Sequence, residues 1–178
     1  MVPFTAELLP AVRPWFVHPE VRKWLGGPDW PERELRLRDS NPGEEFRGRL
    51  TLRAHSWVLL DQTDEPVAKI GGDVYDRWTV YAGERDGEAL VTSSIDEVTM
   101  GLPYVVDPRR WRQGFGRAAL LAVIDHPETA AVKRFVAGID ALNMASRRCA
   151  VSAGFVVDDP VPDFEDTVYY CYRRWAVS

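Results

Sequence analysis

The sequence predicts a mixed α/β fold with a largely antiparallel sheet, in a single domain over residues 1–178. Composition is the first observation behind this prediction. Apolar residues make up 46% of the chain and charged residues 28%, a balance typical of a folded globular domain. Periodicity is the second, because strand and helix patterns alternate through the second half of the chain, which then closes on a pair of antiparallel strands.

Three helices are expected in the first part of the chain, over residues 6–16, 18–26 and 31–39. Thr5 is the expected N-cap of the first helix. Pro10 and Pro14 must break or kink that helix, because proline lacks the N–H that a helical hydrogen bond needs. The Gly-Gly-Pro stretch at 26–28 ends the second helix.

An antiparallel hairpin is expected over residues 56–76, with its turn at 62–65. Gly71 and Gly72 lie inside the second strand of this hairpin, which indicates a bulge or a close approach of another backbone. The next segment has a weaker pattern, and its 83–88 stretch, GERDGE, is expected to be a loop.

The second half of the chain alternates strands and helices. Strands are expected over 96–107 and 134–141, helices over 117–126 and 143–153, and two closing antiparallel strands within 155–175. Pro103 lies inside the first of these strands, so that strand must carry a bulge or an unpaired side. Gly154 is placed to end the second helix in the manner of a C-cap.

The stretch WRQGFGRAAL, residues 111–120, combines two glycines with arginines at the start of a helix. Such a loop can present successive N–H groups to a phosphate at a helix N-terminus. Gly114, Gly116 and Ala119 satisfy the dinucleotide fingerprint G-x-G-x-x-G/A, and Asp140 follows where a ribose-binding acid would belong. The rival interpretation is a loop for the pyrophosphate of coenzyme A.

Three observations favour coenzyme A over a dinucleotide. Seven residues, 107–113, separate Val106 from Gly114, whereas the dinucleotide loop follows its strand almost directly. Only one more strand–helix unit follows, and a dinucleotide fold needs several. The intervening residues are DPRRWRQ, whose three arginines suit a diphosphate.

Composition argues against several classes of partner. The net charge of −5 disfavours nucleic acid, and no apolar stretch approaches the ~20 residues of a membrane span. The N-terminus lacks the basic and apolar regions of a signal peptide. Cys149 and Cys171 match no metal spacing, so we expect a reduced, cytoplasmic protein without a metal site.

Two motifs together resemble the GNAT superfamily of N-acetyltransferases. YVVDPRRWRQGFGRAALL is similar to the family's central strand, pyrophosphate loop and helix, with Trp111 where Arg or Gln is commonest. DALNMASRRCAVSAGF is similar to the next motif through Asn143, Ser146, Gly154 and Phe155. One helix and one strand separate the motifs, as in the family, and the resemblance covers residues 56–175.

The resemblance implies a GNAT-type acyl-CoA N-acyltransferase fold with a splayed central strand. Because only MVPF precedes the first expected helix, the family's first strand should be short or missing. The resemblance also implies acetyl-CoA as the donor. The matching coenzyme-binding positions are Val105, Val106, Arg112, Gln113, Gly114, Phe115, Gly116, Arg117, Asn143 and Ser146.

The catalytic groups of the family match this sequence less well. The tyrosine that often protonates the leaving thiolate is replaced by Ala150, which leaves Ser146 as the nearest matched hydroxyl. The usual positions of a strand carboxylate are Met100 and Leu102, which cannot act as a base. The candidates are therefore Glu97, with its neighbour Asp96, and Asp73, with Asp76 as a further alternative.

The sequence therefore predicts an enzyme that moves an acetyl group from acetyl-CoA to a primary amine by direct attack. The acceptor is left open between a small cationic amine, which the acidic clusters would attract, and a peptide or protein N-terminus. A homodimer stays open as well. The alternatives are a non-catalytic acyl-CoA-binding module and, less favoured, an NAD-dependent oxidoreductase.

Overall fold

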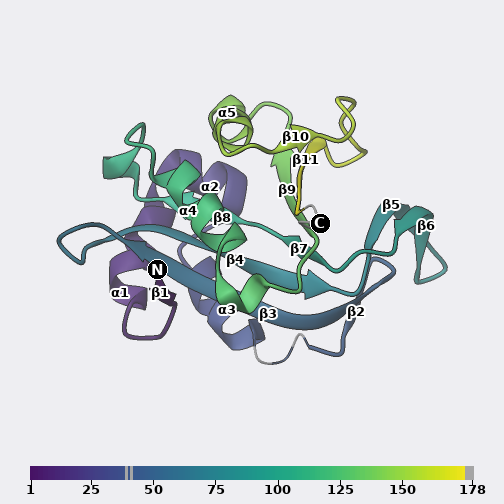
Figure 1. The fold of residues 1–178 in the computed structure, drawn as a ribbon, viewed down its shortest axis with the longest axis horizontal. Helices are drawn as coiled ribbons and strands as arrows, with labels where there is room; N and C mark the ends of the chain where they lie inside the picture. The colour runs from purple at the N-terminus through teal and green to yellow at the C-terminus, as the bar shows by residue number, and fades with distance from the viewer. Residues whose placement is uncertain (39, 41, 175–178) are drawn as a thin grey trace.

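The computed structural model describes residues 1–38, 40 and 42–174, and its main feature is a sheet that opens at its centre (Figure 1). Strand order along this sheet is β1-β3-β4-β7-β9-β11-β10, with β2 and β8 pairing at β3 and β4. Among the described residues of this sheet, only β7 and β9 pair in parallel, and the other ladders are antiparallel. The predicted mixed, mostly antiparallel sheet with a splayed central strand is confirmed.

The strands of this sheet are β1 (Val2–Pro3), β2 (Glu45–Phe46), β3 (Arg49–Leu60), β4 (Pro66–Tyr75), β7 (Thr99–Gly101), β8 (Tyr104–Val106), β9 (Arg134–Asp140), β10 (Val156–Val157) and β11 (Thr167–Arg173). A separate hairpin joins β5 (Trp78–Arg85) and β6 (Glu88–Ile95). The helices are α1 (Leu9–Val12), α2 (Pro19–Leu25), α3 (Trp30–Arg38), α4 (Phe115–Ile124) and α5 (Met144–Ser152). Short 3-10 turns are η1 (Arg13–Val17), η2 (Pro108–Arg110) and η3 (Pro127–Thr129).

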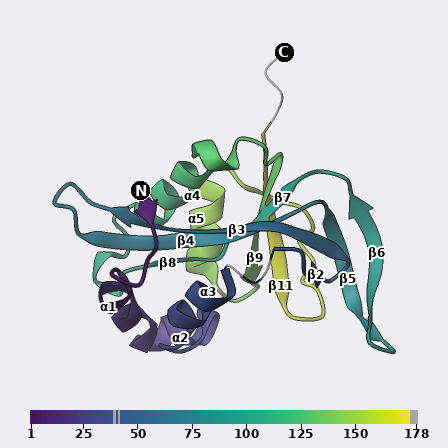
Figure 2. The same ribbon diagram turned by 90° about the horizontal axis from the view of Figure 1, so that it is seen from below.

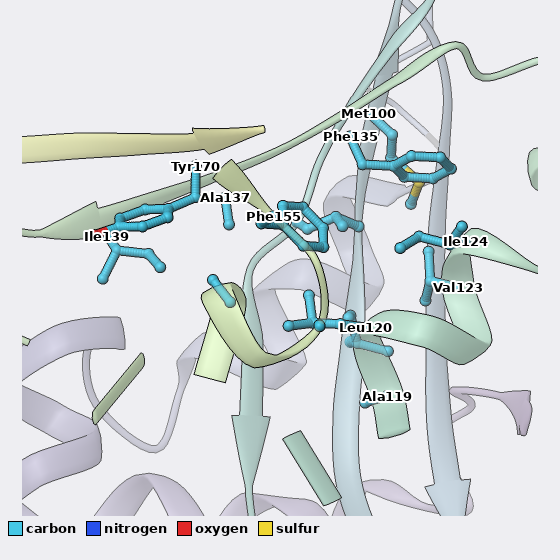
Figure 3. Close-up of a cluster of buried hydrophobic side chains, with 14 of the residues drawn as sticks. Met100, Ala119, Leu120, Val123, Ile124, Phe135, Ala137, Ile139, Phe155 and Tyr170 are labelled. Carbon is cyan, nitrogen blue, oxygen red and sulfur yellow. The ribbon is translucent and has the colours of Figure 1, made fainter. Parts of the chain in front are cut away.

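Helices cover both faces of the sheet. Figure 2 shows α4 on one side of β3 and β4, with α1, α2 and α3 on the other. The α4 side holds the larger core, in which Leu120 and Val123 pack with Phe135 of β9 and with Phe155 (Figure 3). On the other side a buried ion pair ties α3 to the sheet, since Lys69 Nζ lies 2.6 Å from both carboxylate oxygens of Glu34.

Prolines shorten the first predicted helix. The helix begins at Leu9 rather than at residue 6, its N-cap is Leu8 rather than Thr5, and the chain continues from Arg13 as a 3-10 turn. Pro10 and Pro14 each occupy the first turn of their segment, where a missing N–H costs nothing. The second and third helices are confirmed, although Asp39 at the predicted end of the third lies outside the described residues.

Two strand predictions need correction. The predicted 83–88 loop is wrong, because β5 continues to Arg85 and β6 begins at Glu88. Only Asp86 and Gly87 form the turn, both with positive φ, which is the geometry that Asp-Gly favours in a two-residue hairpin. The first hairpin strand begins at Arg49, seven residues before the predicted start at 56.

Apart from the 96–107 strand, the remaining strand and helix predictions hold with small shifts in their ends. The first strand is short rather than missing, with Val2 opposite Val58 and Pro3 opposite Trp57 of β3. The two closing strands are β10 and β11, and Trp175 at the predicted end of the second lies outside the described residues.

Pro103 divides the predicted 96–107 strand into β7 and β8. The Leu102 N–H donates to Val136 O of β9 at 2.8 Å, and after this bond β8 pairs only with β4. Gly71 stands beside the break, where its N–H donates to Pro103 O. The predicted close backbone approach is confirmed, because a Cβ on Gly71 would lie 2.2 Å from His55 O, and one on Gly72 would lie 1.9 Å from Gly101 O.

Candidate functional site

A cleft of about 960 Å³ lies at the fork between β8 and β9. Its first end is lined by β8, the loop after it and the starts of α4 and α5. Its second end is lined by β2, the first residue of β3, β4, β5, β9 and β11, and α2 lines the cleft beside the loop. Nine of the ten coenzyme positions that the sequence predicts line this cleft: Val105, Val106, Arg112, Gly114, Phe115, Gly116, Arg117, Asn143 and Ser146. Gln113 is exposed and does not line it.

The loop before α4 is shaped to present N–H groups. Arg112 (φ +62°) and Gly114 (φ +87°) both adopt left-handed backbone conformations, and Gly114 is the N-cap of α4. Within the described chain, the backbone N–H groups of residues 111–117 have no backbone acceptor. Such a concave row of N–H groups at a helix N-terminus is the usual setting for a phosphate.

Gly116 brings the first turn of α4 against α5 and β8. A Cβ at this position would lie 2.7 Å from the Cys149 Sγ and 3.5 Å from a methyl group of Val106. Any larger residue would therefore push these elements apart at the floor of the cleft. This contact explains the second glycine of the motif by packing, whereas Gly114 has open space around it.

The loop arginines divide into paired and unpaired groups. Arg109 is held by Asp107 at 2.7 Å, and Arg110 forms an ion pair with Asp61. Arg117 Nε donates to Ser152 O at 2.8 Å, which joins α4 to the end of α5. No carboxylate of the described chain pairs with Arg112, so this side chain is the one most available to an anion.

Trp111 has a structural role in this sequence. Its indole Nε1–H donates to Val106 O at 3.0 Å, and its ring meets His18 edge-on at 4.8 Å. His18 is the N-cap of α2, so Trp111 connects the loop to the helix that forms one wall of the cleft.

Backbone alternation decides which amides of β8 face the fork. Asp107 N–H donates to Val67 O and Pro103 O accepts from Gly71, so residues 103, 105 and 107 turn their polar groups toward β4. Tyr104 and Val106 consequently point theirs away from β4, into the open fork. Of the two valines that the sequence predicts in the site, Val106 therefore has its N–H available to a ligand. The N–H of Val105 is hydrogen-bonded to β4 within the sheet.

A cluster of hydroxyl and thiol groups lies on the same wall. Tyr104 Oη and Ser146 Oγ are 2.6 Å apart, and the Tyr104 hydroxyl also donates to Ser146 O at 3.1 Å. Burial raises the pKa of Tyr104 far above its ordinary value and raises that of Cys149, so both groups keep their protons at neutral pH. Ala150, at the family's tyrosine position, is wholly buried in the core.

The second end of the cleft is aromatic and carries charges of both signs. Phe46, Tyr75, Trp78 and Tyr169 line it, together with the charged side chains Arg47, Arg49 and Asp140. The sequence points to Asp140 only as a ribose ligand of the rival dinucleotide site, and it gives no sign of Arg49. Asp140 lies near the end of the predicted 134–141 strand, whereas no local pattern could have placed Arg49 beside the fork.

The predicted catalytic carboxylates lie elsewhere. Asp73 lies on β4 and accepts a 3.4 Å hydrogen bond from the Tyr75 hydroxyl, and Glu97 precedes β7 with an oxygen 3.7 Å from Arg173 Nε. Neither lines the cleft, unlike Ser146. The acidic 158–166 loop is also outside the lining, and two of its carboxylates pair with Arg47 and Arg134.

Two further features narrow the chemistry of the described residues. No group of three or more His, Cys, Asp or Glu side chains among them is arranged to hold a metal ion. None of their helices is long and apolar enough to cross a membrane.

A parallel strand pair that opens above a glycine-rich helix start defines the class of protein, a coenzyme A-binding acyltransferase. The model of the acetyltransferase (GNAT) domain family matches residues 1–156. The uncharacterized N-acetyltransferase YfmK of Bacillus subtilis (strain 168) is 30% identical over 120 residues, which cover 66% of this chain and 78% of that protein. The chain belongs to the GNAT family and is an acetyl-CoA-dependent N-acetyltransferase.

Solved structures agree with this fold. The aminoglycoside acetyltransferase AAC(6')-Ib in complex with coenzyme A matches with a TM-score of 0.67 at 16% identity, over 97% of this chain and 92% of that one. The ribosomal-protein-S5-alanine acetyltransferase from Vibrio fischeri matches with a TM-score of 0.60 at 15% identity, over 96% and 90%. The oxidoreductase alternative is wrong, because a dinucleotide fold needs several parallel strand pairs and the described sheet has one.

The loop assignment predicts the effect of Gly114→Val. Acetyl-CoA at a hundredfold excess over its Kd should stabilise the wild type by about 2.7 kcal/mol, and the variant should lose this gain because a branched side chain obstructs the phosphates. Thermal unfolding of both proteins with and without acetyl-CoA measures this stabilisation.

Gly87→Val is the matched control. Gly87 has a similar backbone (φ +83°) and open surroundings, but it lies in the β5–β6 turn outside the cleft. Both variants should lower the Tm of the free protein, since a branched residue is strained at positive φ. Only Gly114→Val should abolish stabilisation by acetyl-CoA. If Gly114→Val keeps the full stabilisation, the loop does not hold the pyrophosphate.

Proposed function

We propose that this enzyme transfers the acetyl group of acetyl-CoA to a primary amine by direct attack of the amine. The carrying observation is the fork, at which β8 turns the N–H groups of Tyr104 and Val106 away from β4 into the cleft. N–H groups fixed in this way can stabilise an oxyanion as it forms, with an effect of about 3 kcal/mol for one donor. The N-acetyltransferase name of the Bacillus relative supports an amine acceptor.

The donor would be held by the chain's own backbone at the first end of the cleft. The amides of residues 112–117 and the Arg112 guanidinium would bind the pyrophosphate, and the edge of β8 would hold the arm that leads to the thioester. Acetyl-CoA supplies the activated acyl group. Asn143 caps α5 by accepting from Ser146 N–H at 3.1 Å, so its part is to fix the helix that carries Ser146.

Asp140 is our candidate for the group that takes the proton from the amine. It ends β9 at the fork, lines the cleft and is half-buried. Its Oδ1 accepts from Leu142 N–H at 2.8 Å, which orients the carboxylate and leaves Oδ2 available. Glu20 is the other carboxylate that lines the cleft, but it lies on α2 rather than on the strand at the fork.

Ser146 and Tyr104 would protonate the departing thiolate. Their hydroxyls form a pair on the wall of the cleft. Burial raises the pKa of Tyr104, so this hydroxyl keeps its proton but is a weak acid, and the hydroxyl that gives its proton to the sulfur would regain one from solvent. The pair would thus take the part of the family's usual tyrosine, which is absent here, with one hydroxyl from β8 and one from α5. A thiol with a pKa of ~8.5 is already a fair leaving group, so this assistance should be modest.

The acceptor side belongs to the same proposal. A primary amine on a small molecule or on a peptide N-terminus fits a cleft that is open to solvent and walled by aromatic rings. A cytoplasmic location is also proposed, and the unpaired thiols of Cys149 and Cys171 support it.

A panel of primary amines with acetyl-CoA tests the proposed function. We expect the wild type to acetylate at least one amine of the panel and to release coenzyme A as it does so. Asp140→Asn should lower kcat/KM for that amine by about 10²-fold or more, because the amide cannot accept the proton. The Kd for acetyl-CoA should stay within about twofold, since Asn can still accept the Leu142 N–H bond.

Asp159→Asn is the matched control for this experiment. Asp159 accepts from Val161 N–H at 2.8 Å in the same local arrangement, but it lies outside the cleft. It should leave kcat/KM unchanged. Equal activity of Asp140→Asn and wild type would remove Asp140 from the mechanism, and failure of every amine in the panel would contradict the proposed reaction.

Ser146→Ala and Tyr104→Phe test the proton donor. Each should lower kcat by about tenfold while the Kd for acetyl-CoA changes little, because the hydroxyl pair acts on the leaving group rather than on binding. Steady-state kinetics and a separate binding titration measure the two quantities. A weaker Kd with unchanged kcat would assign the pair to coenzyme binding instead.

A further inference from the structure

Arg49 is a buried cation that the acetyl-transfer mechanism does not use. It begins β3, its side chain lines the second end of the cleft, and the residue is only 5% exposed to solvent. Its Nε is buried without a hydrogen-bond partner in the described chain. A guanidinium keeps its charge at any ordinary pH, so this cation enters the cleft permanently charged.

No carboxylate of residues 1–38, 40 and 42–174 lies within ion-pair distance of Arg49. Nearby Arg47 differs, because its two terminal nitrogens grip Glu165 at 2.7 and 2.8 Å. Burial accordingly lowers the pKa of Arg49, whereas the hydrogen bond to Glu165 raises that of Arg47. An unpaired buried charge carries a desolvation penalty, which a ligand of opposite charge would offset.

Aromatic rings hold this guanidinium in place. Its carbon lies 3.8 Å from the ring centre of Trp78, 5.0 Å from that of Tyr75 and 5.8 Å from that of Phe46. Aromatic rings offer no conventional acceptor to the guanidinium N–H groups, and no carboxylate of the described residues pairs with them, so these N–H groups are left for a partner. The hydroxyl of Tyr75 donates to Asp73 at 3.4 Å.

We propose that Arg49 is a specificity residue that binds a carboxylate on the acceptor, so that the amine acceptor is an amino acid or a peptide with its carboxylate free. This proposal rests on the proposed function and deepens it. The carboxylate would meet the N–H edge of Arg49 in a two-bonded fork, and the rest of the acceptor would lie along the aromatic wall toward the fork at β8 and β9.

The surroundings favour a carboxylate over other charged acceptors. One guanidinium in an aromatic setting matches a single negative charge, whereas a phosphate at neutral pH brings nearly two. A polycation would meet the fixed charge of Arg49 at close range. The small cationic amine that the acidic composition suggested is therefore disfavoured. The acidic 158–166 loop does not offset the charge of Arg49, because this loop lies outside the cleft.

Matched acceptors test this proposal. Each pair carries the same amine with a carboxylate or with a carboxamide: phenylalanine and phenylalaninamide, 6-aminohexanoate and its amide, and a dipeptide with a free or amidated C-terminus. The wild type should prefer the carboxylate of at least one pair by about tenfold or more in kcat/KM. The pair with the largest preference identifies the source as a free amino acid or a peptide end.

Variants of Arg49 locate the preference. Arg49→Gln should reduce the carboxylate-to-amide ratio to about one and leave the Kd for acetyl-CoA unchanged, and Arg49→Lys should restore part of the ratio through its charge. Arg85→Gln is the control, because Arg85 is an exposed cation on β5 outside the cleft, and it should keep the full ratio.

A binding titration makes the test independent of turnover. The carboxylate and amide of each pair are titrated into wild-type protein saturated with coenzyme A, which needs neither acetylation nor a folded variant. Tighter binding of a carboxylate supports the proposal even if no amine is acetylated. The lack of acetylation would contradict only the proposed reaction. Equal or weaker binding of every carboxylate, or a preference that survives in Arg49→Gln, overturns the proposal and leaves Arg49 as a packing residue.

Discussion

The cleft depends on one backbone hydrogen bond, which is the last one that joins the central strand to β9 before the sheet opens. Leu102 N–H donates to Val136 O at 2.8 Å, and beyond it Pro103 interrupts the strand. β7 before the break pairs on both sides, whereas β8 after it pairs only with β4. An unpaired strand edge inside a protein needs a partner, because buried N–H and C=O groups are costly to leave unsatisfied. Under the proposed function, the coenzyme arm would be the partner of this edge.

The rest of the cleft follows from what surrounds this edge. The loop before α4 turns its amides toward one end, and Gly116 lets α4 lie close to Cys149 and Val106 so that the floor stays intact. α5 brings Ser146 to Tyr104 across the same wall. The opposite end is different in chemistry, since it combines aromatic rings with Arg49 and places Asp140 at the tip of β9. Donor and acceptor would thus meet at the fork from environments of different charge.

Local signals predicted much of this site, and tertiary pairing explains the remainder. Gly114 and Gly116 could be identified because glycines at a helix N-terminus are typical of phosphate binding, and the strand and loop around them favoured coenzyme A over a dinucleotide. Pro103 likewise predicted the break in its own strand. Tyr104 and Ser146 lie 42 residues apart, so their hydrogen bond had no sequence signature. Arg49 was hidden for another reason: β3 begins seven residues before the predicted strand, where Arg49 and Leu50 pair with β2 and the Arg49 side chain lines the cleft.

The central claim, that the coenzyme completes the open edge of β8, is tested most directly by residue-resolved amide hydrogen exchange with and without acetyl-CoA. Tyr104 and Val106 should exchange more slowly when acetyl-CoA is bound, as should the amides of residues 112–117. Val105 provides an internal comparison, because its N–H already faces β4 opposite Lys69 and should change much less. Protection of the 112–117 amides with no change at Val106, or an equal change at Val105 and Val106, would contradict the account.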